Sequence, residues 1–200
     1  MFSFVLWDRR RRRLLAARDR MGIKQLYYYL SPTKLILASE IKAILMDPDV
    51  QRGVDPKALA DYYFCGRALG DKTMFRGIRE LEPGHRLSVD LQTGRHEIRR
   101  YWQLQYSYDR SRSDEAVKEA LFDALDQSVK IHCRSDASLG CHLSGGLDSS
   151  TVVALASRHR PGLKTFSIRF AEEGYLDETQ FARAVSRHVG AQYCEGSPNS

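Results

Sequence analysis

Residues 139–156 contain the pattern that most constrains how this chain can fold. A short apolar run, residues 139–143, is followed by the sequence SGGLDSS at 144–150 and then by a second apolar run. A strand, a tight turn and the start of a helix account for that order. Two adjacent glycines can adopt backbone angles closed to other residues, and they let main-chain N–H groups approach a ligand. The pattern therefore predicts a strand, a tight turn with accessible N–H groups and a helix N-terminus.

This turn has the chemistry of a site for the phosphates of ATP. The first N–H groups of a helix are unpaired and lie at the positive end of its dipole, which favours phosphate. Ser144, Ser149 and Ser150 add hydroxyl groups. Asp148 would repel a bare phosphate, so it indicates a Mg²⁺ ion held directly or through water. The lysine of a Walker-type loop is absent. A plain helix cap is the alternative, but a cap requires neither two glycines nor an acid with two serines.

Strand and helix patterns alternate around the turn, which predicts a parallel α/β sheet in the second half of the chain. There, helices are expected at 117–129, 151–156 and 177–189, and strands at 139–143, 164–170 and 191–194. In the first half, strands are expected at 2–7, 14–18, 26–30, 34–38, 86–91 and 95–101, with helices starting at 39 and 55. Residues 106–114 lack apolar periodicity and are predicted to be a linker.

Composition narrows the class of function. No apolar run approaches the roughly 18–20 residues of a membrane span, and no secretion signal is present. The four cysteines form no C-x-x-C pair, which fits a cytoplasmic protein without a metal or redox motif. The net charge of +6 comes largely from five arginines at 9–13. They lie between two predicted strands without interleaved aromatic residues, which favours a solvated hairpin tip over a nucleic-acid surface.

The chain resembles the glutamine-dependent asparagine synthetases over nearly its whole length. Residues 2–8 (FSFVLWD) and 17–28 (ARDRMGIKQLYY) are similar to a signature late in the amidotransferase domain of that family. The segments ASEIKA at 38–43 and LEPGH at 81–85 match two further family segments, and residues 143–150 match its pyrophosphate-binding loop.

The resemblance implies an α/β chain with two domains. Residues 1–105 would be the C-terminal part of an N-terminal-nucleophile amidotransferase domain of α+β fold. Residues 106–114 would be the linker, and 115–200 the start of a parallel-sheet ATP-pyrophosphatase domain. The family's N-terminal cysteine nucleophile has no counterpart here, because Phe2 follows Met1. The catalytic set is therefore expected to be incomplete in this chain, an internal piece of a longer enzyme that is inactive alone.

The resemblance also assigns site residues. The β and γ phosphates and their Mg²⁺ would be held by Ser144, Gly145, Gly146, Asp148 and Ser149. Adenine would be read by backbone groups at Leu143 and Ile168, at the ends of adjacent strands. Ordinary core positions are the alternative for these two residues. Asp177 and Glu178 could approach the nucleotide, but acids in a first helical turn also serve as dipole partners.

The parent enzyme would adenylylate the side-chain carboxylate of aspartate, and ammonia from glutamine would then displace AMP. Its partners would be the small molecules aspartate, glutamine and ATP, and neither a nucleic acid nor a membrane is expected. The resemblance leaves open whether the parent enzyme forms a homodimer. One alternative is a related ligase acting on another carboxylate, such as a β-lactam-forming synthetase or a polysaccharide-associated homologue. Another is a non-catalytic ATP-binding fragment. An RNA-modifying pyrophosphatase is a third, which the amidotransferase-like first half disfavours.

Overall fold

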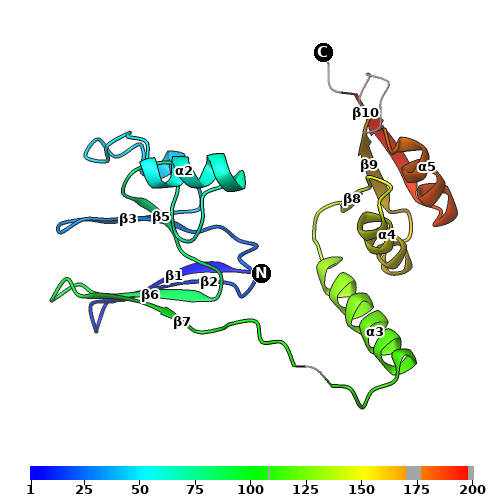
Figure 1. Ribbon diagram of the computed structural model, residues 1–200, viewed down its shortest axis with the longest axis horizontal. Helices are drawn as coiled ribbons and strands as arrows, with labels where there is room; N and C mark the ends of the chain where they lie inside the picture. Colours follow the sequence, from blue (N-terminus) through cyan, green and yellow to red (C-terminus); the bar gives the residue numbers. More distant parts are fainter. Residues whose placement is uncertain (108, 170–176, 198–200) are drawn as a thin grey trace. The chain divides into compact units, whose positions relative to one another are not determined.

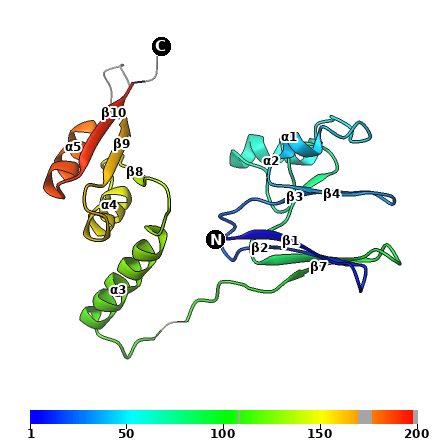
Figure 2. The ribbon, with the colours of Figure 1, turned by 180° about the vertical axis from the view of Figure 1, so that it is seen from behind.

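The computed structural model describes residues 1–107, 109–169 and 177–197, and the chain divides into two compact units, Met1–Ser107 and Tyr108–Ser200 (Figure 1 and Figure 2). Each unit has its own sheets and its own buried core. The expected mixture of helices and strands is confirmed. No helix within these ranges is long and apolar enough to cross a membrane.

Two antiparallel sheets form the first unit, with strand orders β1-β2-β6-β7 and β4-β3-β5. The strands of the first sheet are β1 Ser3–Asp8, β2 Arg13–Arg18, β6 His85–Asp90 and β7 His96–Arg100. Those of the second are β3 Tyr27–Leu30, β4 Leu35–Ala38 and β5 Ile78–Glu80. The six predicted strands are confirmed to within a few residues, whereas β5, three residues long, was not predicted.

The alternation of side chains along β3 creates the layers of this unit. Tyr28 belongs to the buried cluster between the two sheets, together with Leu81 and Leu87. Its neighbours Tyr27 and Tyr29 face the opposite way, toward the cluster beneath helix α1 (Ile41–Ile44). This helix begins two residues after the predicted start at 39, and its first turn has no side-chain cap.

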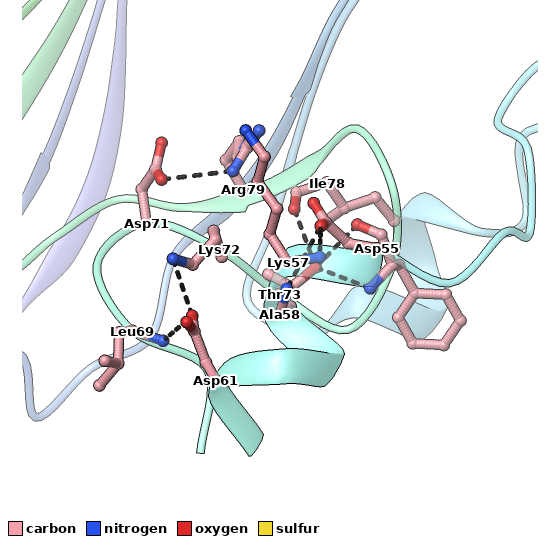
Figure 3. A network of polar contacts seen from close by, with 11 residues as sticks. Asp55, Lys57, Ala58, Asp61, Leu69, Asp71, Lys72, Thr73, Ile78 and Arg79 are labelled. Atoms are coloured by element: carbon pink, nitrogen blue, oxygen red, sulfur yellow. Dashed lines mark hydrogen bonds and ion pairs between the residues drawn. The ribbon is translucent and has the colours of Figure 1, made fainter. Parts of the chain in front are cut away.

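Helix α2 (Pro56–Cys65) begins as predicted, with Asp55 accepting hydrogen bonds from the first-turn amides and proline at the first helical position. The segment after it is fixed by polar contacts (Figure 3). The Asp61 carboxylate accepts from the Leu69 amide at 3.0 Å and pairs with Lys72 at 2.7 Å. These contacts hold the connection between α2 and β5 against the helix.

Asp19 organises the chain directly after β2. Its carboxylate accepts hydrogen bonds from the backbone N–H groups of Phe2, Met21, Ile23 and Lys24. Burial raises the pKa of this carboxyl, but the four backbone donors outweigh it and lower the pKa to about 2. The carboxylate thus ties the first residues of the chain to the turn between β2 and β3.

The arginine block lies where the sequence placed it, at the tip of the β1–β2 hairpin: Arg9 to Arg12 form the turn, and Arg13 is the first residue of β2. Its five arginines are exposed. Asp8 accepts hydrogen bonds from the amides of Arg10 and Arg11, and Arg12 has a φ of 50°. The predicted hairpin is confirmed, with its arginines exposed.

The second unit is a parallel α/β layer, as the alternating pattern predicted. Its strands β8 Gly140–His142, β9 Lys164–Ile168 and β10 Gln192–Gly196 pair in parallel in the order β10-β9-β8. Its helices are α3 Asp114–His132, α4 Leu147–His159 and α5 Thr179–His188. The core contains Leu143, Val153, Leu163 and Ala182. Strand β9 ends before the predicted residue 170, which lies outside the described residues.

Candidate nucleotide site

A pocket of about 290 Å³ opens at the carboxyl ends of β8 and β9. It is lined by His142, Leu143, Ser144, Phe166, Ser167, Ile168, Glu178 and Thr179. Ligands of open parallel sheets bind at this end of the strands. The parallel pairing of β8 and β9 thus brings together Leu143 and Ile168, which are 25 positions apart in the sequence.

Ser144 leads from this pocket into the loop before α4. Its hydroxyl lies 3.0 Å from that of Ser149 and accepts a hydrogen bond from the Gly146 amide at 3.3 Å. Gly146 is the N-cap residue of α4, and no side chain caps the first turn. The arrangement presents two hydroxyls beside uncapped N–H groups at a helix N-terminus, which suits an anion.

The two glycines of the loop have different structural roles. Gly145 has a φ of 95°, and a Cβ there would lie 2.8 Å from the Ala182 amide nitrogen and from the Glu178 carbonyl oxygen. Gly146 has an ordinary φ of −70°, and its nearest neighbour would be the Ser144 hydroxyl at 3.5 Å. The fold therefore requires glycine at 145, whereas at 146 glycine only keeps the helix N-terminus open.

Asp148 lies exposed in the first turn of α4. No group of three or more metal-ligating side chains occurs in the described parts of the chain. A single carboxylate such as that of Asp148 fits Mg²⁺, which proteins commonly hold through one or two carboxylates together with substrate phosphates.

The structure therefore gathers part of the predicted set in the pocket. Leu143, Ser144 and Ile168 line it, and Ser149 joins it through Ser144. Gly145, Gly146 and Asp148 continue the loop without lining the pocket. Ser150 is separate: its hydroxyl is buried, has no partner within the described residues, and lies at a groove between α4 and α5.

Glu178 lines the pocket, whereas its neighbour Asp177 does not. Asp177 accepts from the Thr179 amide at 3.1 Å, and its hydrogen bonds to Thr179 lower the pKa of its carboxyl. Sequence reasoning missed Phe166, Ser167 and Thr179. No sequence signal distinguished Ser167, because β9 has the sequence KTFSI and Thr165 is a second small polar residue in the same strand.

Two known domain families match this chain, one in each of its structural units. Residues 1–102 match the glutamine amidotransferase domain family, and residues 120–195 match the asparagine synthase family. The chain is 35% identical to the amidase chyE of Penicillium rubens over 94% of its own length. It is 32% and 34% identical to the glutamine-hydrolysing asparagine synthetases 1 and 3 of Bacillus subtilis, over 96% and 90% of its length.

In each of these alignments the chain spans 30% of the relative's length. The amidotransferase match lies within the first structural unit, and the asparagine synthase match lies within the second. The chain belongs to the glutamine-dependent asparagine synthetase family.

Proposed function

We propose that this chain is part of a ligase that activates the side-chain carboxylate of aspartate with Mg-ATP and forms asparagine with ammonia from glutamine. The observation that supports it most is the continuity between the pocket at β8 and β9 and the uncapped N-terminus of α4. A base in the pocket and phosphates at the helix N-terminus would use both features at once.

Within this proposal, residues 1–105 belong to the amidotransferase domain, 106–114 to a linker and 115–200 to the ATP-pyrophosphatase domain. Two supports are the family matches at 1–102 and 120–195 and the division of the chain near residue 107. Hydrolysis of glutamine and activation of the carboxylate would then belong to different domains.

The residues of the second domain have distinct tasks in this scheme. Backbone groups of Ile168 bind the base, together with the lone pair of the Leu143 carbonyl that the Ser167 hydroxyl does not use. Ser144, Ser149 and the first N–H groups of α4 bind the β and γ phosphates, each charge-assisted donor contributing roughly 1.5–3 kcal/mol. Asp148 would hold Mg²⁺, which stabilises charge on the departing pyrophosphate.

A second candidate function is amide formation on a different carboxylate. The 35% identity to a protein named as an amidase, rather than an asparagine synthetase, favours keeping it. The fold and the nucleotide site are the same under either candidate.

Mg-ATP binding by the chain should depend on Asp148 and not on Asp177. In calorimetric titrations, Asp148→Ala should weaken Mg²⁺-dependent binding by about tenfold or more, because it removes a charged partner of the metal. Asp177→Ala is the matched control, since this carboxylate also lies beside a helix start but outside the loop that precedes α4. Equal affinities of the wild type and Asp148→Ala would exclude the metal role.

A full-length protein containing this chain should exchange labelled pyrophosphate into ATP only when aspartate is present. The reverse of adenylylation regenerates ATP from bound pyrophosphate. Ser149→Ala should slow the exchange by about tenfold by removing a phosphate contact. Glutamine hydrolysis in the other domain should continue. If exchange requires another carboxylate, the second candidate function is favoured. If no carboxylate supports exchange in a folded protein that binds ATP, the ligase proposal is refuted.

A further inference from the structure

Strands β8 and β9 separate directly after Leu143. Their register pairs Gly140 with Lys164 and His142 with Phe166, and the Leu143 amide still donates to the Phe166 carbonyl at 2.9 Å. In a regular parallel ladder the next bond would run from the Ile168 amide to the Leu143 carbonyl. The described residues do not form that bond.

The hydroxyl of Ser167 takes the place of the missing bond. It donates to the Leu143 carbonyl from a buried position with 7% of the residue exposed. On the other side of β9 the pairing with β10 continues, and the Arg169 amide donates to Gly196 at 2.8 Å. Strand β9 is therefore still extended at Ile168, and the separation is local to its β8 side.

Alternation along β9 gives the direction of the N–H and C=O of Ile168, which have no backbone partner among the described residues. The carbonyl of Phe166 points toward β8 and the amide of Arg169 toward β10. Because successive residues of a strand direct their peptide groups to opposite neighbours, the N–H and C=O of Ile168 both face the β8 side. That side is where the pocket lies, since Ile168 and Leu143 both line it.

We propose that Ser167 is a positioning residue for the base of the nucleotide. By occupying the Leu143 carbonyl, its hydroxyl keeps the ladder open and leaves the N–H and C=O of Ile168 for a ligand. The identity of that ligand rests on the proposed function. Adenine presents an acceptor, N1, beside a donor, the 6-amino group, which complements this pair. Guanine presents a donor and an acceptor in the reverse order, so the same edge discriminates against it.

The Ser167→Ala substitution removes the hydrogen-bond donor of the Leu143 carbonyl. A buried carbonyl without a partner raises the free energy of the folded chain, so this carbonyl should then accept from the Ile168 amide. Hydrogen exchange of the Ile168 amide, followed by NMR on the 200-residue chain, reports this directly. Exchange should be fast in the wild type and at least about tenfold slower in Ser167→Ala. Ser167→Thr keeps the hydroxyl and should restore fast exchange.

Thr165→Val is the matched control for a general effect of losing a buried hydroxyl from β9. Thr165 is fully buried, two residues earlier, and its hydroxyl pairs with that of Ser186 at 3.1 Å. Its replacement should leave exchange at Ile168 unchanged. Slow exchange of Ile168 in the wild type, or the same rate in the wild type and Ser167→Ala, would overturn the role of Ser167.

Titrations with Mg-ATP and Mg-GTP separate this inference from the proposed function. The wild type and Ser167→Thr should prefer ATP, and Ser167→Ala should lose about tenfold or more of that preference. Retention of the full preference by Ser167→Ala would contradict the proposal. If the wild type binds neither nucleotide while exchange at Ile168 behaves as expected, the proposed function fails and Ser167 retains its role in keeping the ladder open.

Discussion

The Gly145→Ala variant should lose about 3–5 kcal/mol of stability in the second unit, from left-handed backbone strain together with overpacking. The φ of 95° is unfavourable for any residue with a Cβ. The added methyl group would also lie 2.8 Å from backbone atoms of residues 178 and 182, at the start of α5. Neither α4 nor α5 can shift its backbone to relieve this contact without disturbing the core around Ala182.

Circular dichroism during denaturation measures this loss, and tryptophan fluorescence supplies an internal control. Both tryptophans, Trp7 and Trp102, lie in the first unit, so the fluorescence transition should keep its midpoint. Gly146→Ala is the matched variant: with φ at −70° and no close contact, it should change stability by less than about 1 kcal/mol. Equal stability of the two variants would contradict the close packing of the loop against the start of α5.

The Asp19→Asn variant should destabilise the first unit by about 2–4 kcal/mol at pH 7. An amide has one oxygen acceptor where the carboxylate has two, so some of the part-buried hydrogen bonds from the N–H groups of Phe2, Met21, Ile23 and Lys24 are lost. Tryptophan fluorescence during urea denaturation follows this unit selectively. Asp90→Asn is the control, because Asp90 accepts backbone hydrogen bonds in an exposed turn and should contribute less.

The pH dependence of this difference has a defined sign. The pKa of Asp19 is about 2 in the folded chain and 3.8 ordinarily, so the unfolded chain binds more protons between these values. The stabilisation, about 2 kcal/mol from this shift, is fully present above the ordinary pKa and is lost as the pH falls through about 2. The gap between the wild type and Asp19→Asn should therefore shrink from pH 5 to pH 2. A gap independent of pH would exclude an ionised Asp19 as its source.

Local patterns predicted most of the elements because they carry their own signals. The helix α2 start follows from aspartate and proline at 55 and 56, and the turn before α4 follows from its glycines. Strand β5 escaped prediction because three residues cannot show an alternation, and its pairing with β3 comes from a distant part of the chain. Tertiary contacts, rather than local preference, make it a strand.

The candidate site likewise has a part that the sequence predicts and a part that it does not. The loop before α4 could be predicted because consecutive residues form it. The sequence did not predict that Phe166, Ser167 and Thr179 line the pocket, because their positions depend on how β9 and the start of α5 pack beside β8. The different demands at 145 and 146 were also invisible in the sequence, since only the approach of α5 distinguishes two adjacent glycines.

Strand β1 lies at the edge of the first sheet, and no strand of the described chain pairs with its outer side. Apolar side chains on both of its faces are exposed, including Leu6 at 57% and Trp7 at 48%. Unpaired edges of this kind recruit other strands. Association through β1 would select folded chains over unfolded ones, and mass action would then raise the apparent stability of the first unit with protein concentration. With such an association, the denaturation midpoint of the first unit would depend on protein concentration as well as on the sequence.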